Sequence, residues 1–159
     1  MRLRKQFESF LEKNLDSAYR FAYSYTGSRE DAEDAVSESV IKALKSLGSL
    51  KNEAYMKTWF FRIIINTTKD MYRKNSKTVF IGDERVFSNE NGVEDDYSRV
   101  NLESLFGCLS EEQRAVTVLR FFEDMKLSQI AEVLSVNENT VKTRLYKALE
   151  VIKKHCDFE

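Results

Sequence analysis

The chain has no proline among its 159 residues and only five glycines. These two residue types are the ones that most often interrupt helices, whereas the leucine, alanine, glutamate and lysine that recur throughout the chain favour them. The sequence therefore predicts an all-α protein. Hydrophobic residues make up 42% of the chain, which is enough to bury one ordinary core or two small ones.

Three helices are predicted in the first half of the chain. Apolar residues at three- and four-residue spacing predict a helix from the N-terminus to Gly27. Ser28 followed by Asp31 is a helix-start pattern, and it predicts a second helix that ends at Gly48. Asn52 is a candidate cap for a third helix, which we expect to run to about residue 75.

The helical periodicity fades between residues 76 and 99, a segment that contains the acidic run Glu94 to Asp96. A structureless segment of this length is too long for an ordinary turn inside a compact domain. We therefore expect two small helical domains, residues 1–75 and 101–159, joined by a flexible acidic linker at residues 76–100.

The second domain is predicted to contain a helix-turn-helix. Ser110 to Gln113 is a capping-box pattern that starts a helix reaching Phe122. Two amphipathic segments follow within residues 127–154, with a turn near Ser135, which is the spacing of that motif. An ordinary helical hairpin with a solvated basic side is the alternative. Candidate DNA contacts near the start of the second segment are Thr140, Lys142, Thr143, Arg144 and Lys147.

The stretch WFFRIIINTTKDMYRKN, residues 59–75, combines an apolar and a polar face. Spacings of four, three and four place Arg62, Asn66, Lys69 and Arg73 on one side of a helix. This face is either the solvated side of a core helix or a basic surface for a polyanion. Phe61 is expected to flank it, where an aromatic ring could stack on a base of a single strand.

An acidic set in the predicted second helix consists of Asp31, Asp34 and Glu38, which share one face. Three interpretations are open: a metal or acid/base cluster, a solvated face, or a docking surface for a basic partner. No histidine accompanies the set, so a metal-dependent enzyme is the least favoured interpretation.

Cys108 and Cys156 lie far apart without CxxC spacing, so neither a zinc site nor a disulfide framework is predicted, and no cofactor is expected. No stretch is apolar enough to cross a bilayer and no signal peptide precedes the first helix, so we expect a cytoplasmic protein.

Three stretches together resemble the extracytoplasmic function (ECF) group of the bacterial sigma-70 family. DAEDAVSESVIKAL is similar to the acidic helix of its region 2, and KTWFFRIIINTTKDMYRK to the helix that follows. LSEEQRAVTVLRFFEDMKLSQIAEVLSVNENTVKTRLYKALEVIKK is similar to region 4. The resemblance implies a noncatalytic subunit that binds core RNA polymerase, directs it to promoter DNA and is held inactive by an anti-sigma factor.

The resemblance also implies roles for individual residues. Asn66 matches an asparagine that lines the pocket for a flipped base of the minus-10 element, and the loop Leu50 to Tyr55 matches the loop that closes over this base. The acidic set would dock on the polymerase. Further minus-10 contacts would be Arg62, Lys69, Arg73 and Phe61. Contacts to the minus-35 duplex would be Thr140, Lys142, Thr143, Arg144 and Lys147, with Arg114 and Arg120 near phosphates.

The chain departs from the family pattern at several positions. Ser110 stands where proline is common, while Ser135 and Asn139 stand where glycine is common. Asn139 lies at the DNA-facing end of the recognition helix. The alternative function is a stand-alone helix-turn-helix regulator, which would leave the Asn66 face and the acidic set unexplained.

Overall fold

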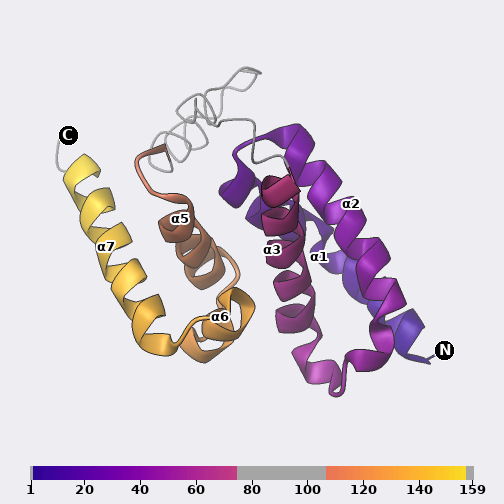
Figure 1. Ribbon diagram of the computed structural model, residues 1–159. Coiled ribbons are helices and arrows are strands. Elements are labelled where there is room, and N and C mark those ends of the chain that lie inside the picture. Colours follow the sequence, from indigo (N-terminus) through magenta and orange to yellow (C-terminus); the bar gives the residue numbers. More distant parts are fainter. Residues whose placement is uncertain (1, 75–106, 157–159) are drawn as a thin grey trace.

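The computed structural model describes residues 2–74 and 107–156, and this part of the chain is almost entirely helical (Figure 1). The predicted all-α class is confirmed. The α-helices are α1 (Arg2–Thr26), α2 (Arg29–Lys45), α3 (Met56–Lys74), α5 (Glu111–Thr117), α6 (Leu127–Leu134) and α7 (Glu138–Cys156). Short 3-10 turns cover Leu47–Ser49 (η1) and Glu53–Tyr55 (η2), and a π-helical turn, η4, covers Val118–Phe122.

The boundary between α1 and α2 lies where the sequence predicts it. α1 ends at Thr26, and Gly27 takes the left-handed φ of 70° while its amide donates to Tyr23 O at 2.8 Å. Glycine adopts this conformation at little steric cost. The hydroxyl of Ser28 then accepts from the amide of Asp31 at 3.2 Å and caps α2.

An aromatic cluster fixes α3 against α1. The ring of Phe60 lies 5.5 Å from that of Phe7 and 5.8 Å from that of Phe10, both in edge-to-face geometry. Phe7 and Phe60 are fully buried. Such pairs contribute about 0.5–1.5 kcal/mol beyond the area they bury. Because this side of α3 is held in the core, the opposite side must face solvent.

The helix predicted to run from Ser110 to Phe122 has a different ending from the one expected. Its start is confirmed, because Ser110 and Gln113 form the reciprocal capping box at 3.0 and 3.1 Å. Its last five residues, however, form the π-helical turn η4. The amide of Glu123 donates to Val118 O, five residues back, and this wider turn ends the helix.

The helices α6 and α7 form the predicted helix-turn-helix pair. Ser135 ends α6 in the left-handed conformation, with φ 60° and ψ 44°, and the amide of Val136 donates to Ala131 O at 3.1 Å. The side chain of Asn137 accepts from the amide of Thr140 at 2.8 Å, so it satisfies a free donor at the start of α7.

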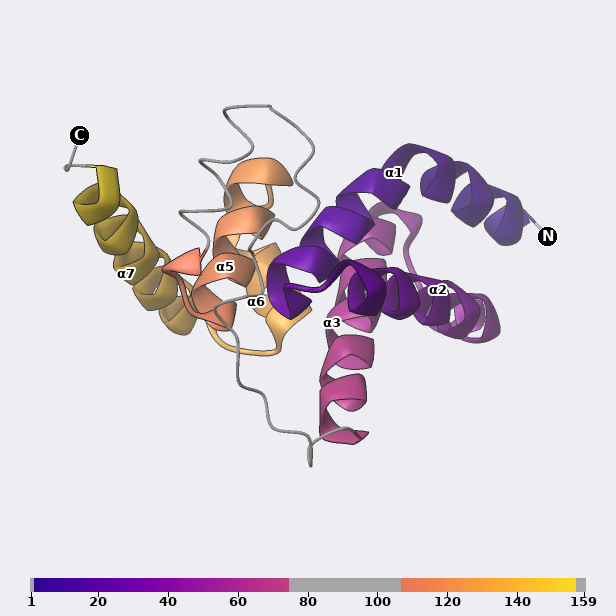
Figure 2. The same ribbon diagram turned by 90° about the horizontal axis from the view of Figure 1, so that it is seen from above.

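The N-terminal half (residues 2–74) and the C-terminal half (residues 107–156) pack directly against each other. α1 contacts α5, and α3 contacts α6. Figures 1 and 2 show α5 and α6 lying between α7 and the N-terminal helices. Buried side chains from both halves belong to one contiguous hydrophobic cluster. The predicted linker, residues 76–100, lies outside the described residues.

Candidate nucleic-acid interface

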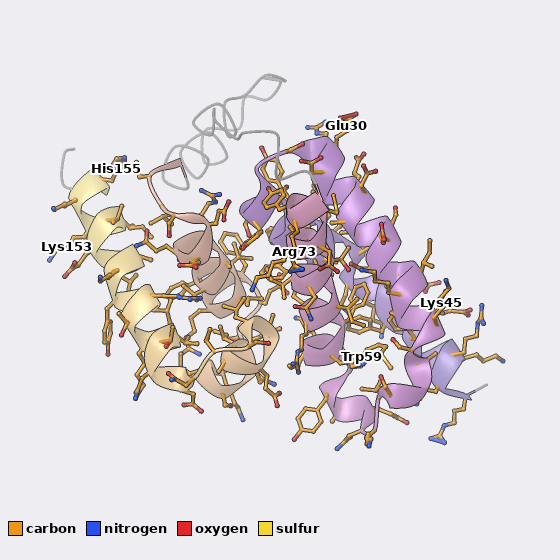
Figure 3. The ribbon with its side chains drawn as sticks, viewed as in Figure 1. Glu30, Lys45, Trp59, Arg73, Lys153 and His155 are labelled. Atoms are coloured by element: carbon orange, nitrogen blue, oxygen red, sulfur yellow. The ribbon has the colours of Figure 1, made fainter. Side chains whose placement is uncertain are left out.

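The polar face of α3 is exposed as the sequence predicts. Arg62, Asn66, Lys69 and Arg73 all lie on the solvent side of the helix. On the opposite side, Ile64 is fully buried, as is Phe60. Figure 3 shows Arg73 near the upper end of α3 and Trp59 near its lower end.

Carboxylate and ammonium groups modify the charge of this face. Asp70 lies 3.4 Å from Arg73 Nη1 and 3.7 Å from the Nζ of Lys42, which comes from α2. Lys42 also donates to the hydroxyl of Thr67 at 3.2 Å. Exposed pairs of this kind contribute only about 0–1 kcal/mol, so phosphates can compete for both cations. Sequence reasoning missed Lys42, because only the packing of α2 on α3 brings it to this face.

The expectation that Phe61 flanks the polar face is wrong. Its side chain has 0% exposure and stacks on Phe21 of α1, with ring centroids 5.3 Å apart. Successive helical residues differ by about 100° in direction, and this turns Phe61 from the side of Arg62 toward α1. A base cannot reach the ring in this structure.

The loop of residues 50–55 is anchored beside the first turn of α3. The sequence predicts that Asn52 caps the third helix; the side chain of Asn52 instead caps the short turn η2, and α3 begins at Met56. The indole Nε1 of Trp59 donates to the hydroxyl of Ser49, just before the loop, at 3.4 Å. Tyr55 is exposed and is the aromatic residue that this loop presents to solvent. It is a candidate contact that sequence reasoning did not single out.

A polar pocket lies at the start of α7, and residues of α5 form its other wall. Its volume is about 480 Å³. Of the residues predicted to contact the minus-35 element, Thr140, Thr143, Arg144 and Lys147 line it, while Lys142 is exposed outside it. The remaining lining residues are Ser110, Glu112, Gln113, Asn137 and Asn139.

Arg144 is oriented by a partner from α5. Its Nη2 lies 3.7 Å from Glu112 Oε2, and the two side chains are 24% and 62% exposed. Sequence reasoning missed Glu112 and Gln113 as parts of this surface. No local pattern could have found them, because the contact depends on how α5 packs on α7.

The two arginines expected near phosphates differ in their surroundings. Arg120 is exposed and donates to Met125 O at 2.8 Å. Arg114 is only 9% exposed; it donates to Ser24 O in α1 and, at 2.8 Å, to Leu109 O. In this structure the N-terminal half covers the guanidinium of Arg114, and the phosphate contact by Arg114 stays a prediction.

The acidic set lies on one side of α2. Asp34 and Glu38 are exposed, and Asp31 is half-buried in the first turn. Burial, and secondarily the charge of Asp34, raises the pKa of Asp31 above its usual value. Figure 3 shows Glu30 and Lys45 at opposite ends of this helix. Within residues 2–74 and 107–156, no group of three or more histidine, cysteine or acidic side chains is arranged to hold a metal ion.

Family models match both halves of the chain. The model of sigma-70 region 2 matches residues 10–78, and that of sigma-70 region 4 matches residues 99–152. The RNA polymerase sigma factor SigV of Bacillus subtilis is 41% identical over 85% of this chain and 81% of its own length. The chain belongs to the ECF group of the sigma-70 family. It is therefore an RNA polymerase sigma factor, and such proteins are noncatalytic initiation subunits.

A further relative and two solved structures are also similar to this chain. The ECF sigma factor SigW of Bacillus subtilis is 27% identical over 93% of this chain and 87% of its own length. The sigma factor RpoE of Bartonella quintana, solved with the anti-sigma factor NepR, shares the fold with a TM-score of 0.77 and 24% identity, covering 94% of this chain and 96% of its own. CnrH, solved with the cytosolic domain of CnrY, shares the fold with a TM-score of 0.72 and 22% identity, covering 98% of this chain and 90% of its own.

Among the described residues of this sigma factor, no helix combines the length and the hydrophobicity that a membrane span requires.

Proposed function

We propose that the exposed polar face of α3 captures the melted non-template strand of the minus-10 element. The observation that carries this proposal is that one side of α3 is locked into an aromatic core while Arg62, Asn66 and Lys69 face solvent. A base leaves its stack at a cost of a few kcal/mol, and a positioned amide with cations around it can offset that cost. Asn66 is the residue assigned to the flipped base.

The start of α7, together with the polar pocket, would read the minus-35 element as duplex DNA. Arg144, Lys147 and Thr143 open onto this pocket, and exposed Lys142 lies beside it. Arginine and lysine can reach phosphates or guanine edges in the major groove. Residues 1–75 and 101–159 then act as two reading domains of one protein.

The acidic set of α2 would dock on core RNA polymerase, and the sigma factor would be controlled by an anti-sigma factor. Asp34 and Glu38 are exposed and available to a basic partner. Two solved structures that share this fold were determined as complexes, and in one of them RpoE is bound to the anti-sigma factor NepR. The protein would act in the cytoplasm, without catalytic activity of its own.

Run-off transcription with core polymerase tests the minus-10 assignment. Asn66→Ala should lower open-complex formation about 10- to 100-fold, since a specific base contact is worth roughly 1–3 kcal/mol, while polymerase binding stays unchanged. Asn14→Ala, which removes an asparagine on α1 away from this face, is the matched control. Loss of polymerase binding in Asn66→Ala would refute the assigned role. Tight promoter binding by the wild-type chain alone, without transcription when polymerase is added, would favour the stand-alone regulator.

A further inference from the structure

The loop of residues 50–55 presents an aromatic ring to solvent. Tyr55 is 54% exposed and lies in the turn η2, directly before α3. The residues that border the loop are buried, since Leu50 is 8% exposed and Met56 is 6% exposed. The ring of Tyr55 therefore projects from a short segment whose two ends are fixed in the core.

Helical periodicity aligns Tyr55 with the polar face of α3. The turn η2 leads into the helix without a break, because Met56 already has the α-helical dihedral angles φ −59° and ψ −40°. Arg62 and Asn66 follow Tyr55 by seven and eleven residues. At about 100° per residue, both side chains point within about 20° of the direction of Tyr55. The exposed ring thus continues the face to which the melted strand is assigned.

The distance along the helix places Tyr55 beyond the base assigned to Asn66. At about 1.5 Å per residue, the two residues are separated by about 16 Å along the helix axis. This is the length of about five stacked nucleotides at about 3.4 Å each, and fewer if the strand is extended. Tyr55 and Asn66 therefore face different nucleotides of one strand.

The surroundings of Tyr55 have the composition of a single-strand site. Lys51 lies in the same loop and Arg62 lies between Tyr55 and Asn66, and both cations are exposed. Proteins bind single strands by stacking bases on aromatic rings while cations follow the phosphates. Stacking depends on the face of the ring and not on base identity, so this part of the surface adds affinity with little selectivity.

A carboxylate of η2 ties the loop to α1. Oε1 of Glu53 accepts from Nε2 of Gln6 at 2.9 Å, and Oε2 of Glu53 lies 3.8 Å from Nη2 of Arg2. Within the loop, the side chain of Asn52 accepts from the amide of Ala54 at 2.9 Å. These contacts restrict the loop before any ligand arrives, and a ring that is already held in place loses less conformational freedom on binding.

We propose that Tyr55 is a second base-stacking site for the melted non-template strand, and that Glu53 positions it through Gln6 of α1. This inference rests on the proposed capture of that strand by the polar face of α3. A base a few nucleotides from the one assigned to Asn66 stacks on the ring, while Arg62 meets a phosphate between them. The first turns of α1 thereby contribute to promoter binding without touching DNA.

Abasic substitutions in premelted promoter DNA test the stacking site. The polymerase holoenzyme is bound to DNA whose non-template strand is single-stranded across the minus-10 element, and each base of that strand is removed in turn. Tyr55→Ala should weaken binding of the intact strand about 5- to 100-fold and make binding insensitive to base removal at one position. Tyr55→Trp should restore both properties, because it restores an aromatic face. Leu15→Ala removes an exposed apolar side chain of α1 and should behave as wild type.

The position of the insensitive base separates Tyr55 from Asn66. Asn66→Ala should become insensitive to base removal at a different position, a few nucleotides away. A position shared by the two variants would overturn the second site, and so would a Tyr55→Ala holoenzyme that keeps wild-type sensitivity at every position. Insensitivity in Tyr55→Ala but at no position in Asn66→Ala would support the stacking site and contradict the role proposed for Asn66.

Two variants of Glu53 test its positioning role. Glu53→Ala and Glu53→Gln remove the same charge, but the glutamine oxygen can still accept from Gln6. On the intact strand, Glu53→Gln should bind about 2- to 10-fold more tightly than Glu53→Ala. On the strand that lacks the base facing Tyr55, the two variants should bind equally. A difference that persists on the abasic strand, or no difference on the intact strand, would refute positioning by Glu53. Glu12→Ala, on exposed α1, is the control for the loss of a carboxylate.

Discussion

The two candidate reading surfaces are built in different ways. The α3 surface is carried mainly by one helix, whose opposite side is fixed by large aromatic rings, and Lys42 of α2 adds a cation to it. The α7 surface is shared with α5, because Glu112 and Gln113 complete its pocket and Glu112 pairs with Arg144. A surface carried by one helix depends on that helix being rigid, whereas a shared surface depends on the packing of two. Substitutions should therefore affect the two surfaces differently.

The largest expected effect is on the anchoring of α3. Phe60→Ala should lower the free energy of unfolding by about 3–5 kcal/mol, because it empties the centre of the aromatic cluster. Val141→Ala, at an equally buried site in α7, should cost about 1–3 kcal/mol. Urea unfolding monitored by circular dichroism measures both. Equal losses would show that the two helices are anchored alike.

The next effect concerns the charges of the α7 surface. Replacing Lys142 and Arg144 by alanine should weaken minus-35 binding by the polymerase holoenzyme about 10- to 100-fold and reduce the slope of log K against log salt by about two units. Lys5 and Lys13, exposed on α1, give a control with the same loss of charge. A footprint over the minus-35 element that matches wild type would contradict the proposed docking of α7.

Features of the molecule that depend on local spacing could be predicted from the sequence, and those that depend on tertiary packing could not. The alternation of Asn66 and Ile64 between solvent and core follows from helical periodicity, and the Ser28 cap follows from its own pattern. The burial of Phe61 and Arg114 depends on α1, which lies far away in the sequence. The pairing of Glu112 with Arg144 likewise requires the fold.

A third prediction concerns the junction of α1 and α3, where two stacked tyrosines lie. Burial raises the pKa of Tyr25 to about 12, and burial followed by the charge of Glu111 raises the pKa of Tyr72 still further. Unfolded tyrosine ionises near pH 10, so the stability gained from the neutral rings is complete below about pH 10 and is lost as the pH rises through the raised values. Tyr72 also donates to Thr26 O at 3.2 Å.

The variant Tyr72→Phe separates the contribution of the hydrogen bond to Thr26 from that of the ionisable hydroxyl. At pH 8 the variant should be about 1 kcal/mol less stable, since it lacks the hydrogen bond, but its stability should fall less steeply than that of wild type between pH 10 and 12. Urea unfolding at pH 8 and pH 11 provides the measurement. Tyr146→Phe, at an exposed site in α7, should leave the slope unchanged. A Tyr72→Phe slope equal to that of wild type would argue against ionisation at this junction.

The smallest expected effect is at the turns that follow α1 and α6. Both use a residue with left-handed φ, but the first turn has Gly27 at 70° and the second has Ser135 at 60°. A residue with a Cβ atom is strained there by about 1 kcal/mol, whereas glycine loses more entropy on folding. Ser135→Gly should therefore raise the free energy of unfolding by about 0.5 kcal/mol, and Gly27→Ser should lower it by about 1 kcal/mol. Ser128→Gly, inside α6, should be destabilising, so the same exchange of serine for glycine has opposite signs at two sites seven residues apart. Thermal unfolding of the three variants measures these changes in stability. A destabilised Ser135→Gly variant would mean that the hydroxyl of Ser135 stabilises this turn by more than the backbone strain destabilises it.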